Sequence, residues 1–317
     1  KSLGLTAGTA AEDGNNIVLG DDALIDYVIA DNDSSDIDLI QSTSTTEFGG
    51  VDRITSGSGS DLIIGGRFGD TIDAGDGANV IIGDSGRITA ASADGPQLAG
   101  IPMTFGLIET ISSADGGADA ITTGTGRDII LGGYGGDTIK ADYALVDEQE
   151  TVGSGINLVL GDNGLVDYTR ADRVATAGAD IDPTDLDFVK SLDEGIGGSD
   201  TITTGDGSDL VIGGTGADTL TVNDGNNLVL GDSGQITAGS TEGPQLSGLP
   251  LTIGEIVTTA DGVGGSDIIA AGGGDDIVVG GTNDATDDSG TTFDERIETI
   301  TAGEGQNIVL GDAGRID

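Results

Sequence analysis

Aspartate returns at every ninth position over much of this 317-residue sequence, and carboxylates at that spacing could hold a hard divalent cation. Glycines cluster just before each aspartate, as in GGYGGDTIK (132–140). A tight glycine turn supplies only oxygen ligands, which calcium takes in sets of about six to eight, whereas magnesium demands octahedral geometry and keeps its waters. We therefore expect calcium ligands among Asp52, Asp61, Asp70, Asp119, Asp128, Asp137, Asp200, Asp209, Asp218, Asp267 and Asp276.

The charge balance also indicates bound cations. The chain has 56 acidic and 11 basic residues, a formal net charge of −45 at pH 7. Aspartates stacked about 5 Å apart would repel one another, and salt screens this repulsion only in part. We therefore expect calcium binding to be coupled to folding, with the metal-free chain largely unfolded.

Composition excludes several classes of function. Because the sequence has no Cys and no His, it can form no disulfide, no thiol nucleophile, no Ser-His-Asp triad and no His-ligated zinc site. Its negative charge disfavours nucleic acid and anionic membranes as partners. The longest apolar runs are four or five residues, so no membrane insertion is expected.

The elements that position these aspartates are short strands. Two residues after each Asp stands an aliphatic residue, such as Ile63, Ile139 or Val211. The Asp–x–aliphatic–x stretch has period two, which is typical of a strand, and the glycines before it form a turn. Such short strands are stable only when stacked, so two nine-residue rows should form one 18-residue coil of a parallel solenoid. The sequence predicts an all-β fold of this kind.

Alternate rows differ in the residues beside the buried aliphatic position. The Asp61 row has Leu62 and Ile64, whereas the Asp137 row has Thr138 and Lys140. One of the two sheets should therefore have an apolar outer face, which is rarely left in water. Either apolar inserts such as 23–29 and 96–111 or another chain must cover it, and we expect the inserts to do so.

A longer period of 148 residues lies above the nine-residue one. GDSGRITAASADGPQLAGIPMTFG (83–106) returns as GDSGQITAGSTEGPQLSGLPLTIG (231–254). We divide the single solenoid into a first super-repeat at 16–156, a second at 157–306 and the start of a third at 307–317, with inserts of 33–40 residues interrupting the rows. The sequence ends in nearly the phase where it begins, as expected for a piece of a longer tandem array or a unit that continues into a copy of itself.

GGYGGDTIK and GGTGADTLT (213–221) resemble the nonapeptide G-G-x-G-x-D-x-U-x of RTX proteins, and partial matches cover most other rows. The resemblance implies a parallel β-roll in which Asp carboxylates and turn carbonyls of adjacent coils hold Ca²⁺, with the eleven aspartates named above as ligands. Two departures matter. Phe68 replaces a glycine of the motif, and Asn79, Asn157, Asn227 and Asn307 replace Asp. Rows with Asn should bind calcium more weakly or form an uncharged Asn ladder.

A second type of turn follows the Asn rows, with the sequence GD-x-G or, once, GDDA. It contains Asp21, Asp84, Asp162, Asp232 and Asp312. These aspartates could bind calcium or could cap turns through hydrogen bonds to the main chain. The sequence leaves both roles open, and we retain them as candidate metal ligands.

Catalysis is not expected, because nearly every acidic cluster recurs at 148 residues as a structural unit would. Asp275/Asp276 and Asp287/Asp288 could imitate a glycosidase pair, but turn or calcium-site roles fit them better.

We predict a calcium-stabilised extracellular structural protein, a rod or a self-assembling fibre or surface layer. Its partners would be copies of itself joined head to tail, since an uncapped solenoid end is an interface. The resemblance implies secretion by a bacterium. The alternatives are a section of an adhesin that binds polysaccharide or ice, and a calcium-dependent accessory module of a secreted enzyme.

Overall fold

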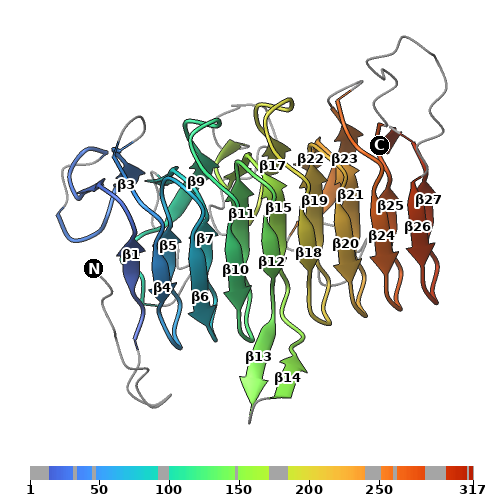
Figure 1. Ribbon diagram of the computed structural model, residues 1–317, viewed down its shortest axis with the longest axis horizontal. Coiled ribbons are helices and arrows are strands. Elements are labelled where there is room, and N and C mark those ends of the chain that lie inside the picture. Colours follow the sequence, from blue (N-terminus) through green and yellow to red (C-terminus); the bar gives the residue numbers. More distant parts are fainter. Residues whose placement is uncertain are drawn as a thin grey trace.

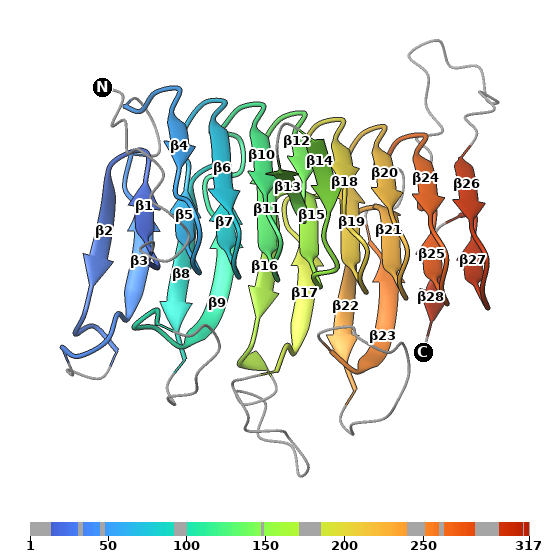
Figure 2. The same ribbon diagram turned by 90° about the horizontal axis from the view of Figure 1, so that it is seen from below.

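Each nine-residue row forms one short strand, and two rows close one coil of a flattened helical roll. The computed structural model describes residues 14–30, 34–44, 48–91, 100–146, 149–170, 185–239, 251–259, 263–282, 298–312 and 314–316. The coils stack along one axis with β1 at one end and β27 at the other, and three large sheets run along this axis (Figures 1 and 2). The described residues contain no helix long and apolar enough to cross a bilayer.

The central sheet is built from the rows with apolar flanks. All its strands are parallel and in register, so that Ile63, Ile81 and Ile130 lie side by side. In order across the sheet, its strands are β1 (Ile17–Leu19), β5 (Leu62–Ile64), β7 (Val80–Ile82), β11 (Ile129–Gly133), β15 (Leu158–Asp162), β19 (Leu210–Gly214), β21 (Leu228–Asp232), β25 (Ile277–Val279) and β27 (Ile308–Leu310).

The outer sheet is built from the rows with polar flanks and is also parallel. Its inward residues, such as Ile72, Ile121 and Ile139, form a second aliphatic row in register. In order along the chain, its strands are β4 (Arg53–Thr55), β6 (Thr71–Gly75), β10 (Ala120–Thr123), β12 (Thr138–Lys140), β18 (Thr201–Thr203), β20 (Thr219–Val222), β24 (Ile268–Ala271) and β26 (Thr299–Ala302).

The inserts form a third, antiparallel sheet, which we call the cover sheet. Each insert contributes a hairpin, and neighbouring hairpins pair edge to edge, as β9 does with β16. In order across the sheet, its strands are β2 (Ala23–Asp26), β3 (Leu39–Ser42), β8 (Gly86–Ala90), β9 (Phe105–Thr110), β16 (Gly164–Asp167), β17 (Phe188–Ser191), β22 (Gly234–Ala238), β23 (Ile253–Thr258) and β28 (Arg315–Ile316).

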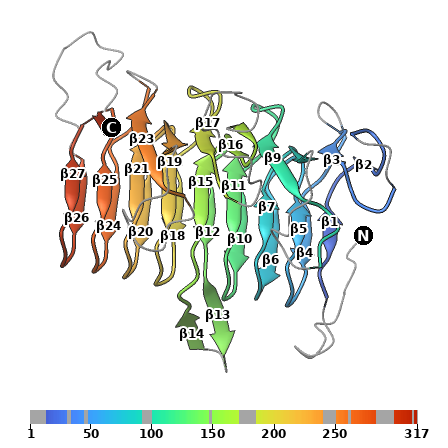
Figure 3. The ribbon, with the colours of Figure 1, turned by 180° about the vertical axis from the view of Figure 1, so that it is seen from behind.

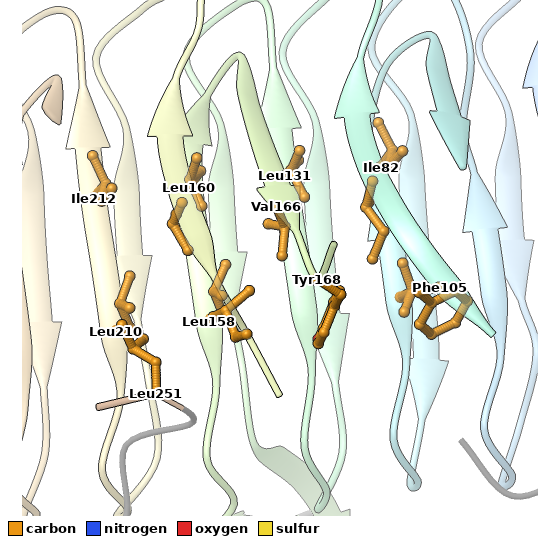
Figure 4. Packing of buried hydrophobic residues seen from close by; sticks show 14 of the residues in the cluster. Ile82, Phe105, Leu131, Leu158, Leu160, Val166, Tyr168, Leu210, Ile212 and Leu251 are labelled. Carbon is orange, nitrogen blue, oxygen red and sulfur yellow. The ribbon is translucent and has the colours of Figure 1, made fainter. Parts of the chain in front are cut away.

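Two apolar cores separate these three layers. The first lies between the outer and central sheets and contains the aliphatic rows, with Ile63, Ile139 and Val211 fully buried. The second lies between the central and cover sheets, where Leu131 and Leu160 of the central strands lie beside Val166 of an insert (Figure 4). The prediction that the inserts cover the apolar sheet face is therefore confirmed for the described residues.

One hairpin lies outside these layers and was not predicted. Strands β13 (Tyr143–Val146) and β14 (Gln149–Val152) pair with each other in an antiparallel ribbon that projects beyond the ends of the neighbouring strands (Figures 1 and 3). The ribbon lengthens the turn between β12 and β15, where other coils have a short glycine turn.

The fold class predicted from the sequence is confirmed: an all-β parallel roll with 18-residue coils of two rows each. The hydrogen-bonded partners Asp52 and Asp70, and likewise Asp200 and Asp218, lie 18 residues apart where no insert intervenes. The acidic pair Asp287/Asp288 lies outside the described residues.

Candidate metal centre

The turns lie along two edges of the roll, and each edge has its own ladder of side chains. Turns that lead from the central sheet to the outer sheet form the first edge, as at 65–70. Its ladder, which we call the carboxylate ladder, stands just before the outer strands. It consists of Asp52, Asp70, Asp119, Asp137, Asp200, Asp218, Asp267 and Glu298.

Hydrogen bonds connect each rung of the carboxylate ladder to the next coil. The main-chain N–H of Asp52 donates to Oδ1 of Asp70 at 2.6 Å, and the N–H of Asp70 donates to Oδ1 of Asp119 at 2.6 Å. The series continues in the same way to the N–H of Asp267, which donates to Oε2 of Glu298 at 3.0 Å. From Asp70 to Glu298, one carboxyl oxygen of each rung therefore holds the register between coils.

The second oxygen of these carboxylates is buried and, within the described part of the chain, has no hydrogen-bond partner. This holds for Oδ2 of Asp70, Asp119, Asp137, Asp200, Asp218 and Asp267. A buried carboxylate oxygen without a donor is costly, so a sixfold repetition of one indicates a missing positive partner.

A main-chain carbonyl faces the same space as each of these oxygens. The side of Gly132 that has no Cβ faces both Oδ2 of Asp137 and the carbonyl oxygen of Gly161 in the next coil. An equivalent pair, one Asp Oδ2 and one main-chain carbonyl oxygen, faces each of Gly65, Gly83, Gly161, Gly213 and Gly231. A carboxyl oxygen and a carbonyl oxygen that face one point suit a cation that takes oxygen ligands.

Without a cation, burial raises the pKa of these carboxyl groups and favours their protonated forms. Burial, with the nearby Asp84 and Asp137 carboxylates adding to it, raises the pKa of Asp119 to about 10. Burial raises the pKa of Asp137 to about 7, and burial followed by the Asp162 carboxylate raises that of Asp200 to about 9. A bound divalent cation would favour the ionised forms instead.

The aspartates of the GD-x-G turns stand beside this ladder and cap two turns each. Asp84 accepts the N–H of Gly117 at 3.0 Å on Oδ1 and the N–H of Tyr134 on Oδ2. Asp162 accepts the N–H of Gly198 at 2.9 Å and that of Thr215. Asp21 and Asp232 repeat the arrangement.

Each of these aspartates therefore joins two segments: the loop that follows a cover hairpin, and the glycine turn of the next coil. Burial is the largest cause that raises the pKa of Asp84, Asp162 and Asp232 to about 8, and neighbouring carboxylates raise it further. Asp312, in the last coil, is exposed. A role for these residues as calcium ligands remains a prediction.

The opposite edge has a different ladder, which we call the mixed ladder. It stands after the turns that lead from the outer sheet back to the central sheet. Each coil contributes one rung, and the rungs alternate between asparagine and aspartate from one coil to the next. Its rungs are Asn16, Asp61, Asn79, Asp128, Asn157, Asp209, Asn227, Asp276 and Asn307. The Asn rows therefore do not form an uncharged ladder of their own, because each Asn lies next to an aspartate.

The described structure adds one ladder residue that the sequence analysis missed. Glu298 takes the place of Asp in the last rung of the carboxylate ladder. It stands nine residues before Asn307, and Ile300 follows two residues later, so the nine-residue spacing could have identified it.

Phe68 keeps the turn geometry of the glycine that it replaces. Its φ is 71°, in the left-handed region where Gly135 and Gly216 of the equivalent turns have 122° and 116°. A bulky residue there costs about 1 kcal/mol or more. The Arg67 guanidinium lies 5.1 Å from the centre of the Phe68 ring and partly offsets this cost.

The donor set of the carboxylate edge fits calcium. It contains only oxygens, and it combines side-chain carboxylates with main-chain carbonyls. Within the described residues, no three Asp, Glu, His or Cys side chains converge on one point as a metal site. An ion between adjacent rungs would therefore take at most two ladder carboxylates and complete its shell with turn carbonyls.

The fold and this edge together define a parallel β-roll whose turns repeat an oxygen-only donor set that suits a cation. The family model described as RTX calcium-binding nonapeptide repeat (4 copies) matches residues 49–87, 113–142, 194–229, 258–286 and 294–315. These stretches of the chain are therefore RTX calcium-binding nonapeptide repeats, and repeats of this kind bind calcium ions. No curated protein and no solved structure matches the chain.

Replacing Gly132 by alanine should destabilise the calcium-loaded roll by about 3 kcal/mol. The added Cβ would lie 2.4 Å from Oδ2 of Asp137 and 2.0 Å from the carbonyl oxygen of Gly161, inside the space that the cation would use. Gly195→Ala is the matched control, since its Cβ would meet nothing within 4 Å. Thermal unfolding in millimolar calcium checks this, and equal stability of the two variants would contradict the proposed cation space.

Proposed function

We propose that this chain is a calcium-stiffened extracellular structural repeat protein, which forms a rod or a self-assembling fibre or surface layer. The observation that carries the proposal is the uniformity of the roll. The same registering hydrogen bond, at 2.6–3.0 Å, recurs from coil to coil along the carboxylate edge, where short glycine turns alternate with cover hairpins. A repeated unit without a distinctive centre suits a structural role rather than a catalytic one.

The last coil supports association with a further coil. Val278 in β25 is fully buried inside the roll, whereas Val309, the equivalent residue of β27, is 46% exposed. Ile308 of the same strand is 48% exposed, against 8% for Ile277. Within the described residues, β27 has only one neighbouring strand. A continuing array or a second copy joined head to tail would bury these side chains.

An extracellular location fits the chemistry of the sites. RTX repeat proteins are typically secreted by bacteria. Sites made of turn carbonyls and shared carboxylates suit the millimolar calcium found outside cells, where extracellular modules bind with dissociation constants of about 10⁻⁴–10⁻³ M. The chain would therefore fold after it reaches calcium.

Negative-stain electron microscopy with millimolar calcium, and then with chelator, tests the proposal. We expect long uniform fibres that disappear when calcium is chelated. Short separate rods in calcium would contradict self-assembly and would indicate one section of a longer adhesin. Fibres that persist in chelator would contradict a role for calcium in the assembly.

A second candidate function is binding to a regular surface such as a polysaccharide or ice, for which the outer sheet provides the observation. Its outward residues form two ranks in register, with Thr201 beside Thr219 and Thr203 beside Thr221. Arg53, Asp73 and Lys140 interrupt the ranks. This candidate, like an accessory role beside a secreted enzyme, would be favoured if the microscopy showed only short rods.

A further inference from the structure

We propose that calcium binds along the carboxylate edge only, and that hydrogen bonds between Asn and Asp replace it along the mixed edge. The inference rests on the calcium binding of the repeats and specifies which turns of this chain carry it. The two edges would therefore have different roles, with one dependent on the metal and the other independent of it.

Along the mixed edge, the Asn side chains add hydrogen bonds between coils. Nδ2 of Asn79 donates to Oδ1 of Asp128 at 3.0 Å, and the N–H of Asp128 donates to Oδ1 of Asn157 at 3.2 Å. The Nδ2 atoms of Asn16, Asn157 and Asn227 each donate at 3.0 Å to the Asp of the following coil. Each of these four Asn residues thus binds a carboxylate with its amide hydrogens.

Asn amide groups of the mixed ladder also donate to carbonyl oxygens of their own turns. Nδ2 of Asn16 donates to the carbonyl of Gly14 at 2.7 Å, that of Asn227 to the carbonyl of Asn223 at 3.1 Å, and that of Asn307 to the carbonyl of Gly303 at 3.0 Å. A cation in such a turn would need these carbonyl oxygens. It would instead meet amide hydrogens, which carry partial positive charge.

The alternation means that no space on the mixed edge lies between two carboxylates in the described structure. Asp61, Asp209 and Asp276 each keep one buried oxygen without a partner among the described residues, and Oδ2 of Asp128 accepts the Thr123 hydroxyl at 2.6 Å. These are single carboxylates in alternate coils, each followed by an amide. Among the ladder rungs alone, an ion between coils would therefore meet one carboxylate on this edge and two on the other.

On the carboxylate edge, every space lies between two acids. Seven consecutive hydrogen-bonded steps join its eight rungs, and none of these rungs is an amide. The caps Asp84, Asp162 and Asp232 add further carboxyl groups to this edge. One ion in each space would give about seven calcium ions, whereas occupation of both edges, with eight more steps on the mixed ladder, would give about fifteen.

The test compares two aspartates that stand nine residues apart on opposite edges of one coil. Asp200 and Asp209 are 2% and 0% exposed and each accepts a main-chain N–H on Oδ1. The full chain and the variants Asp200→Asn and Asp209→Asn are dialysed against millimolar calcium, and bound calcium is counted per folded chain. We expect about seven ions for the parent, one or two fewer for Asp200→Asn, and no loss for Asp209→Asn.

A third variant, Asn227→Asp, keeps the proposal testable if Asp200→Asn fails to fold. The substitution puts a carboxylate between those of Asp209 and Asp276, so that three consecutive rungs of the mixed ladder become acidic. We expect this variant to bind one or two ions more than the parent.

Three results would overturn the inference while leaving calcium binding intact. They are a parent count near fifteen, a loss of calcium in Asp209→Asn, and an unchanged count in Asn227→Asp. A parent that binds no calcium would overturn calcium binding itself.

Discussion

Removal of calcium should unfold this protein completely rather than loosen it. In millimolar calcium, a site with a dissociation constant of about 10⁻⁴ M contributes about 1.4 kcal/mol to folding stability. About seven such sites would together contribute about 10 kcal/mol, which is comparable to the whole stability of a typical domain, about 5–15 kcal/mol. Each carboxylate of the ladder would then face another across one coil spacing with no cation between them, as Asp137 faces Asp200.

Circular dichroism and small-angle X-ray scattering measure this loss. In excess chelator we expect the β-sheet signal to disappear and the radius of gyration to rise toward the roughly 60 Å of an unfolded chain of this length. Calcium should restore both signals, and an equal concentration of magnesium should not, because magnesium holds its waters and demands octahedral geometry. A roll that keeps its sheet signal in chelator would refute the coupling of metal binding to folding.

Acid should replace calcium in the metal-free chain. Burial is the main cause that raises the pKa of Asp70, Asp137 and Asp267 from 3.8 to about 7 and that of Asp218 to about 9. Groups whose pKa is higher in the folded state bind protons more tightly there than in the unfolded state. Their contribution to stability is complete below pH 3.8 and is lost as the pH rises through about 7 to 9.

The expected size of this effect is large. A single carboxyl group such as Asp137, raised from 3.8 to about 7, changes the stability by on the order of 4 kcal/mol across that window. In chelator, the far-ultraviolet circular dichroism should therefore show a folded chain near pH 5, still above the isoelectric point of about 4.1, and an unfolded chain at pH 8. In saturating calcium the chain should be folded at pH 8. Metal-free protein that is unfolded at every pH from 5 to 8 would contradict the burial of these carboxyl groups.

The roll itself could be predicted because its causes are local and repeated. The spacing of Asp52, Asp61 and Asp70 sets the length of a row, and the aliphatic residue two positions later sets the face that is buried. The flanks Leu62 and Ile64 identified the apolar sheet face, and the apolar inserts identified its cover. Each of these features follows from the pleat of a strand and the period of a turn.

The arrangement of the cover and of the mixed ladder depends on contacts between distant residues. The pairing of β9 with β16 joins hairpins of separate inserts, and no local pattern specifies that Glu109 lies opposite Leu165. The alternation of Asn and Asp along the mixed ladder, which begins with Asn16 and Asp61, becomes visible only when residues on the same edge of successive coils are compared. The two capping bonds of Asp84 likewise join positions 33 and 50 residues away.

The direction of the hydrogen bonds in the roll has a mechanical consequence. Each coil is bonded only to the coils before and after it, and these bonds run along the axis of the roll, as between Ile139 and Ile202 of adjacent strands. Tension applied to the two ends would therefore peel coils away one at a time instead of breaking the whole sheet at once. Each 18-residue coil would release about 60 Å of extended chain. In calcium, a rod of this design would lengthen in steps under load and would rewind when the load falls.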